Sequence, residues 1–78
     1  MNAEQFLDRF SYAIEADPGT LSLDVNYQEL PVWDSLNLLS VIAMADADFG
    51  ITLSGHDIQS CTTIGDLFRL AEAKAATP

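Results

Sequence analysis

The chain has 78 residues, of which 49% are hydrophobic, and 12 acidic residues against 3 basic ones give it a formal net charge of −9. This length holds a single domain, 1–78, whose apolar content suits a packed core, and the acidity excludes nucleic acid and membrane surfaces as partners. One cysteine, Cys61, excludes an internal disulfide framework, and no segment resembles a membrane span or secretory signal; we expect a monomeric cytoplasmic protein.

The N-terminal segment predicts a helix over Ala3–Ala16, because apolar residues such as Phe6 and Phe10 recur there at helical spacing. We expect Pro18-Gly19 to end this helix. Proline disfavours helical geometry at the residue before it, and glycine permits the turn that follows.

Residues 19–34 form a long polar segment in which apolar residues alternate. The alternation, at Leu21, Leu23, Val25 and Tyr27, also fits a short strand, but one strand would have no sheet partner in an otherwise helical chain. We therefore expect an ordered loop. Its length in so small a domain indicates that its apolar residues pin it to the core or that it has a function.

The clearest helix runs from Asp34 to Phe49, with Asp34 as the expected N-cap and Gly50 as the expected C-terminal stop. One face is a continuous apolar stripe made of Leu38, Val41, Ile42, Ala45 and Phe49. A second face is largely uncharged and is predicted to be exposed. We call this second face the partner face, and it consists of Leu36, Asn37, Ser40, Ala43, Met44 and Ala47.

Two further helices are expected after Gly50. Ser54 or Gly55 can start one short turn around His56 to Ser60, which is too short to be stable alone. Thr63 to Asp66 then resembles a capping box and opens a last helix, whose apolar residues are Ile64, Leu67, Phe68 and Ala71. The segment Ala75–Pro78 is expected to fray.

Ser35 is the candidate functional residue, because it places a hydroxyl at the first turn of the strongest helix. A phosphodiester built on that hydroxyl would lie beside free backbone N–H groups at the positive end of the helix dipole. Residue chemistry alone also fits a simpler interpretation, in which Asp34 and Ser35 merely cap the helix.

The surrounding pattern resembles the acyl carrier protein family over nearly the whole chain. Asp34-Ser35-Leu36 looks like the attachment motif of that family. The other matching positions are Leu30 before the motif, Leu39, Ile42, Ala45 and Phe49 as second-helix core, and Leu53 and Thr62-Thr63-Ile64 further along. The resemblance implies an all-α four-helix bundle with three longer helices, one short helix and a long loop between the first two.

The resemblance also implies a function. The chain would be a single acyl carrier domain that is not an enzyme and carries acyl intermediates as thioesters on a 4′-phosphopantetheine arm. Because Met1 directly precedes the first helix and no linker follows the last one, we expect a free-standing protein. Coenzyme A would be the source of the arm, a phosphopantetheinyl transferase would attach it to Ser35, and Asp34 and Leu36 would complete the attachment site. Further implied partners are an acyl-loading ligase or acyltransferase and a ketosynthase or other enzymes of fatty-acid, polyketide or related biosynthesis.

This sequence departs from the family pattern at several positions near the motif. Trp33 stands where the family often has glycine; it either shields the attachment site or anchors the loop. Asn37, Ser40 and Ala47 are neutral where the second helix of the family is frequently acidic. A less charged partner face favours a specialised pathway with its own enzymes.

Other interpretations were weighed against the carrier function. The chain would otherwise be an unmodified acidic helical interaction module or a peptidyl or aminoacyl carrier. A calcium loop starting at Asp46 fails because Ile51 replaces the glycine that the sharp turn needs, so no metal site is expected. In the resembled fold the short helix borders the acyl cavity, so His56 either contacts the arm or its cargo or is simply exposed, and we expect the second. Cys61 is expected to be a small core residue with no basic neighbour to lower its pKa.

Overall fold

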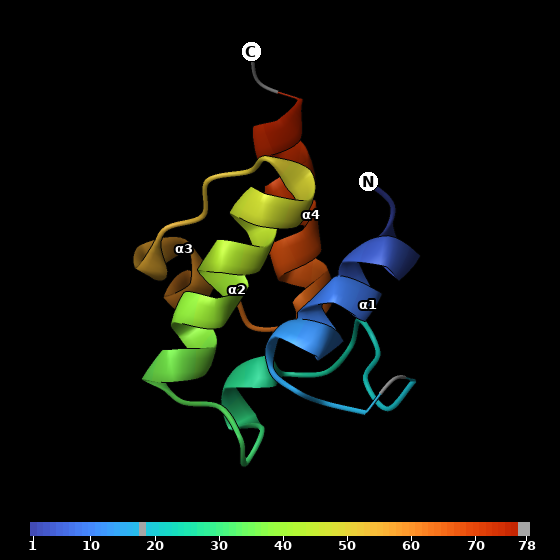
Figure 1. The fold of residues 1–78 in the computed structure, drawn as a ribbon, viewed down its shortest axis with the longest axis vertical. Helices are drawn as coiled ribbons and strands as arrows, with labels where there is room; N and C mark the ends of the chain where they lie inside the picture. The colour runs from blue at the N-terminus through green and yellow to red at the C-terminus, as the bar shows by residue number, and fades with distance from the viewer. Residues whose placement is uncertain (18, 77–78) are drawn as a thin grey trace.

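The computed structural model describes residues 1–17 and 19–76. Its elements are α1 (Ala3–Ala13), the short 3-10 helix η1 (Tyr27–Glu29), α2 (Ser35–Phe49), α3 (Gly55–Ser60) and α4 (Ile64–Ala75) (Figure 1). Within the described residues there is no strand, only an isolated antiparallel bridge between Asn26 and Thr63. The prediction of an all-α bundle with three longer helices and one short helix is confirmed.

Helix α1 is shorter than predicted, and the end expected at Ala16 is wrong. Ile14 is the C-cap, and Glu15 adopts a left-handed conformation with φ 57°. Glu15 N–H donates to Tyr12 O at 3.1 Å and Ala16 N–H donates to Ser11 O at 2.9 Å, which is the Schellman arrangement. The helix therefore ends before the chain reaches Pro18, a residue that lies outside the described ranges.

The first loop is pinned to the start of α4. Ile64 N–H donates to Val25 O at 3.0 Å, and Gly65 N–H donates to Leu23 O at 2.8 Å. These are helix N-terminal donors that have no acceptor within α4 itself. Leu23 and Val25 are also partly buried against the core, as is Leu21. The expectation of an ordered loop held by its apolar residues is confirmed.

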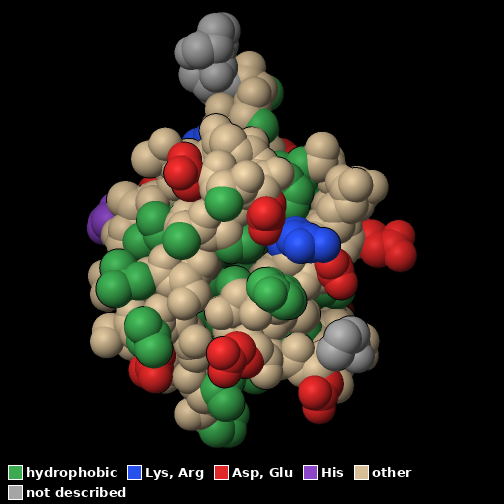
Figure 2. All heavy atoms as spheres, viewed as in Figure 1, with side chains coloured by type: hydrophobic (Ala, Val, Ile, Leu, Met, Phe, Trp, Pro, Cys, Tyr) green, Lys and Arg blue, Asp and Glu red, His purple; other side chains and the backbone are tan. Residues whose placement is uncertain are grey.

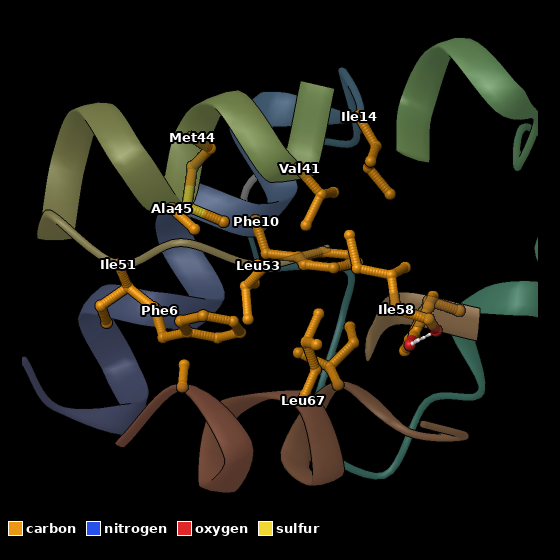
Figure 3. Close-up of a cluster of buried hydrophobic side chains, with 13 residues drawn as sticks. Phe6, Phe10, Ile14, Val41, Met44, Ala45, Ile51, Leu53, Ile58 and Leu67 are labelled. Carbon is orange, nitrogen blue, oxygen red and sulfur yellow. Dashed lines mark hydrogen bonds between the residues drawn. The ribbon is translucent and has the colours of Figure 1, made fainter. Parts of the chain in front are cut away.

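One hydrophobic core joins all four helices (Figure 3). Phe6 and Phe10 come from α1, Val41 from α2, Ile58 from α3 and Leu67 from α4, and each is completely buried. The segment between α2 and α3 adds Ile51 and Leu53. Among the described residues, no helix is long and apolar enough to cross a membrane.

Helix α2 has the predicted ends, but two of its side chains face the opposite way from the prediction. Asp34 is the N-cap and Gly50, with φ 65°, is the C-cap. Met44, expected to be exposed, is 6% exposed, and Leu39, matched to the core, is 60% exposed. At about 100° per residue, Met44 lies roughly 60° from the buried Val41, whereas Leu39 lies roughly 160° from it. Met44 therefore belongs to the core side of α2 and Leu39 to the outer side.

The last two helices start as predicted. Ser54 caps α3 and Thr63 caps α4, each in a reciprocal capping box with the aspartate three residues later. Helix α4 continues to Ala75 with Ala76 as C-cap. The fraying expected for Ala75–Pro78 is thus not seen at Ala75, and residues 77–78 lie outside the described ranges.

Candidate functional site

Ser35 is the first residue of α2 and is exposed. The helix start is fixed on both sides of it, because Asp34 Oδ1 accepts the Asn37 N–H at 2.8 Å and the Asn37 side-chain amide donates to Val32 O. Within the described part of the chain, no hydrogen bond engages the Ser35 hydroxyl. The site thus combines a hydrogen-bonded helix start with an exposed hydroxyl.

The electrostatics at Ser35 come from the backbone. The N–H groups of Ser35 and Leu36 are at the helix N-terminus and have no acceptor among residues 1–17 and 19–76, so they are available to an anion. The basic side chains pair elsewhere: Arg9 with Asp8 at 3.5 Å, Arg69 with Asp66 at 2.5 Å and Lys74 with Asp57 at 3.2 Å. A phosphodiester on Ser35 Oγ therefore fits, with the helix amides as its polar partners.

Trp33 packs inward against the aromatic part of the core. Its ring lies parallel to Phe10, with centroids 6.3 Å apart and an interplanar angle of 3°. It meets Tyr27 edge-on at 4.9 Å. These contacts show that Trp33 anchors the loop that leads into the site, one of the two roles expected for it.

The partner face is only partly exposed as predicted. Leu36 is 68% exposed, and Ala43 and Ala47 are exposed, while Asn37 and Ser40 are half-buried. Met44 is buried and cannot contact a partner. Leu39 is exposed and can. Leu36, Leu39 and Ala43 follow the i, i+3, i+7 spacing and form one apolar line, which we call the α2 ridge. Figure 2 shows hydrophobic side chains gathered on the left-hand surface over α2.

Tyr27 and Gln28 have a structural role that the sequence pattern did not reveal. Completely buried Tyr27 donates its hydroxyl to Ile58 O, and Gln28 Nε2 donates to Cys61 O at 2.6 Å and to Gln59 O at 3.1 Å. Burial raises the pKa of Tyr27, so the hydroxyl stays a neutral donor. These bonds connect residues about 31 positions apart, and no local sequence signal marks them.

The remaining candidates are His56, Cys61 and the acidic residues considered for calcium. His56 is exposed, as expected. Cys61 is half-buried, and desolvation together with the nearby Asp66 and Asp57 raises the pKa of its thiol, which disfavours the reactive thiolate. Asp46 lies on α2 and Asp57 belongs to the capping box of α3, and the described residues hold no group of three histidine, cysteine or acidic side chains that suits a metal ion.

Comparison with known proteins places this geometry in a family. The sequence matches the family described as "Phosphopantetheine attachment site" over residues 4–71. The solution NMR structure of a holo acyl carrier protein from Geobacter metallireducens superposes with a TM-score of 0.76 at 23% sequence identity, covering 97% of this chain and 88% of that chain. No curated protein matches the sequence significantly. The chain therefore has the fold of an acyl carrier protein and belongs to the phosphopantetheine attachment-site family, whose cofactor is a covalently attached 4′-phosphopantetheine.

Proposed function

We propose that Ser35 is the residue that receives phosphopantetheine, with Asp34 and Leu36 completing the attachment motif. The observation that carries this proposal is the exposed Ser35 hydroxyl at the first residue of α2, which makes no hydrogen bond with residues 1–17 or 19–76. Ser35 lies inside the matched range 4–71, and its neighbours hold the helix start in place through the Asp34 and Asn37 hydrogen bonds.

The protein has a carrying role and no reaction of its own in this proposal. When attached, the arm supplies a terminal thiol that holds acyl groups as thioesters. Asp34 keeps the first turn of α2 ordered, and the N–H groups of Ser35 and Leu36 face the phosphate. Ser35 is a substrate of the transferase, and the carboxylate of its neighbour Asp34 serves as the helix N-cap, accepting the Asn37 N–H.

Partner enzymes are proposed to dock on the outer side of α2. The α2 ridge of Leu36, Leu39 and Ala43 supplies the apolar contact, with Asn37, Ser40 and Ala47 beside it. A neutral, apolar face of this kind suits a transferase, an acyl-loading ligase or acyltransferase, and a ketosynthase of a specialised fatty-acid or polyketide-like pathway. Because the ridge is uncharged, we expect its contribution to docking to depend little on salt.

Intact-mass measurement tests the attachment residue directly. The protein is incubated with coenzyme A and a broad-specificity phosphopantetheinyl transferase, and we expect a gain of one phosphopantetheinyl group. Ser35→Ala should abolish the gain, whereas Ser22→Ala, at an exposed serine of the first loop away from α2, should keep it. A gain that persists in Ser35→Ala, or no gain in the parent protein, would contradict the proposal.

The cargo is tested with the modified protein. It is offered to a panel of purified acyl-loading, aminoacyl-loading and ketosynthase enzymes, and loading is read by mass. We expect an acyl-loading enzyme to charge it and Leu39→Asp to slow that loading more than Met44→Leu does, because only Leu39 is at the surface. Charging by an aminoacyl-loading enzyme alone would instead identify a peptidyl-type carrier.

A further inference from the structure

A groove opens near the attachment site, where the end of α1 meets the first loop. Its volume is about 420 Å³, and we call it the loop groove. In Figure 1 the first loop runs from the end of α1 to the start of α2, across the end of the molecule opposite the last turn of α4. The side chains that give the groove its chemistry are Glu15, Asp17, Leu21, Leu30, Pro31 and Val32.

The walls of the groove are apolar and are held by the core. Leu21 and Leu30 are half-buried and pack against the core cluster. Val32 is 55% exposed, so the surface leaves a large apolar side chain open here. An occupant with an apolar stem would cover what remains exposed of these three side chains, which is favourable because apolar surface is removed from water.

Two carboxylates at the groove have no basic side chain to pair with. Glu15 and Asp17 are both exposed. Residues 10–68 contain neither lysine nor arginine. In the described part of the chain, the three basic side chains are paired with other aspartates. A lysine or arginine at this position must therefore come from another molecule.

Glu15 occupies a backbone position that does not favour glutamate. Its φ of 57° lies in the left-handed region, at the turn that ends α1. Glycine adopts this conformation without the steric cost that a Cβ brings. Stability alone thus does not account for a carboxylate at this turn, and strained positions of this kind cluster at binding sites.

An enzyme that reaches Ser35 also covers the loop groove. Val32 precedes Ser35 by three residues, so their Cα atoms are at most about 11 Å apart. The Asn37 side-chain amide donates to Val32 O and holds this segment against α2. A protein interface of ordinary size covers about 800 Å² on each partner, which is a circle of about 16 Å radius. The groove and the attachment site therefore fall within one footprint.

We propose that the loop groove receives an arginine side chain of the transferase that modifies Ser35. The aliphatic stem of the arginine lies along the apolar walls, and its guanidinium group meets the carboxylates of Glu15 and Asp17. Arginine fits better than lysine, because its planar fork of N–H donors can bond two carboxylates while its stem stays on apolar surface. The identity of the partner rests on the proposed function, whereas binding of an alkylguanidinium group is a property of the unmodified chain.

Titration of the unmodified full-length chain with butylguanidinium chloride, followed by NMR, tests the groove itself. The methyl signals of Leu21, Leu30 and Val32 should shift saturably, with a Kd on the order of 1–10 mM. Glu15→Gln combined with Asp17→Asn should weaken this binding about three- to tenfold, because two ion pairs are lost. Guanidinium chloride, which lacks the stem, should not reach saturation over the same range.

Glu4→Gln combined with Glu72→Gln is the matched control. It removes two exposed carboxylates from the first turn of α1 and from α4, and its affinity for butylguanidinium should equal that of the parent. The absence of a saturable shift at the groove methyl groups, or an equal loss of affinity in the control, would overturn the groove as a binding site. Tighter binding of butylammonium than of butylguanidinium would overturn the choice of arginine and identify a lysine site.

Modification kinetics connect the groove to the enzyme. The rate of phosphopantetheine attachment is measured by intact mass against the concentrations of the carrier and of NaCl. In Glu15→Gln with Asp17→Asn, the KM for the carrier should rise about three- to tenfold at low salt while kcat stays nearly unchanged. Added salt should raise this KM less than it raises the KM of the parent. The control variant should stay within about twofold of the parent KM.

Glu15→Gly separates binding from stability. Glycine relieves the backbone strain, so this variant should unfold about 2–6 °C above the parent and yet show a raised KM. An unchanged KM in the variants that lack the Glu15 carboxylate would contradict the assignment to the transferase. If the parent is not modified at Ser35, the proposed function fails, while the butylguanidinium titration still decides the groove.

Discussion

Replacing Tyr27 with phenylalanine removes one hydroxyl and leaves the aromatic packing in place. The ring keeps its edge-on contacts with Phe10 at 5.6 Å and Trp33 at 4.9 Å. What is lost is the donor to Ile58 O and the longer bond to Cys61 O at 3.3 Å. Removing one partner of a buried hydrogen bond typically costs about 1–3 kcal/mol, because a carbonyl group is left without a donor.

Gln28 limits that cost. Its Nε2 already lies 3.4 Å from Ile58 O and 2.6 Å from Cys61 O, so it partly satisfies the same carbonyl groups. We therefore expect Tyr27→Phe to lower the free energy of unfolding by about 1–2 kcal/mol. In a domain of this size, with about 3–5 kcal/mol of net stability, that is a large fraction.

Urea unfolding followed by far-UV circular dichroism and by the fluorescence of Trp33 measures this loss. Tyr12→Phe is the matched control, since Tyr12 is 78% exposed and should tolerate the change. Tyr27 and Gln28 donate to the same two carbonyl groups, so either side chain partly replaces the other when one is removed. The double variant Tyr27→Phe with Gln28→Ala should therefore lose at least about 0.5 kcal/mol more unfolding free energy than the two single variants lose together. If Tyr27→Phe is as stable as the parent, or if the losses of the two single variants simply add in the double variant, Tyr27 and Gln28 do not hold the end of α3 in this way.

Three other predictions follow from packing and charge. Met44→Ala should lower the free energy of unfolding by about 2–4 kcal/mol and Leu39→Ala by less than about 0.5 kcal/mol in the same urea assay, because only Met44 is buried; similar losses would contradict the assigned helix faces. Gly65→Val should lower the melting temperature, because a Cβ there lies 3.1 Å from a loop carbonyl oxygen, while Gly55→Ala, with room for its methyl, should not. The pKa of Asp57 is lowered, chiefly by the backbone N–H at its own N-cap, so its contribution to stability is present above the ordinary aspartate pKa and is lost as pH falls through the depressed value. Asp57→Asn should make the free energy of unfolding depend less on pH in this acidic range. An unchanged pH dependence would contradict the contribution given to Asp57.

Helix positions were largely predictable from the sequence, because local hydrogen bonds set them. Asp34, Ser54 and Thr63 each accept an N–H three residues later, and Gly50 adopts the left-handed conformation that ends α2. Such signals span only a few residues and can be read in the printed chain. The four-helix architecture was expected from the resemblance to the acyl carrier protein family, which rests on the order and spacing of these helices. The role of Ser35 as attachment residue stays a prediction until its mass is measured.

The end of α1 shows where local signals competed. Pro18-Gly19 is a strong stop signal, yet the helix ends earlier through the bonds of Glu15 and Ala16. Glutamate is not a residue that favours positive φ, so nothing in the local sequence predicted this conformation. The turn lets Ile14, 3% exposed, remain in the core as the chain leaves the helix.

The orientation of side chains depended on contacts between distant segments. Whether Met44 or Leu39 faced the core was decided by how α1 and α3 pack against α2, since apolar residues occupy both sides of that helix. The Tyr27 hydrogen bond and the Lys74–Asp57 ion pair join elements that no sequence period relates. The sequence by itself determined the helices and a phosphate-compatible hydroxyl at Ser35. Only tertiary packing decided which surface of α2 is open to partners and how α3 is fastened beside it, because burial is a property of the assembled helices.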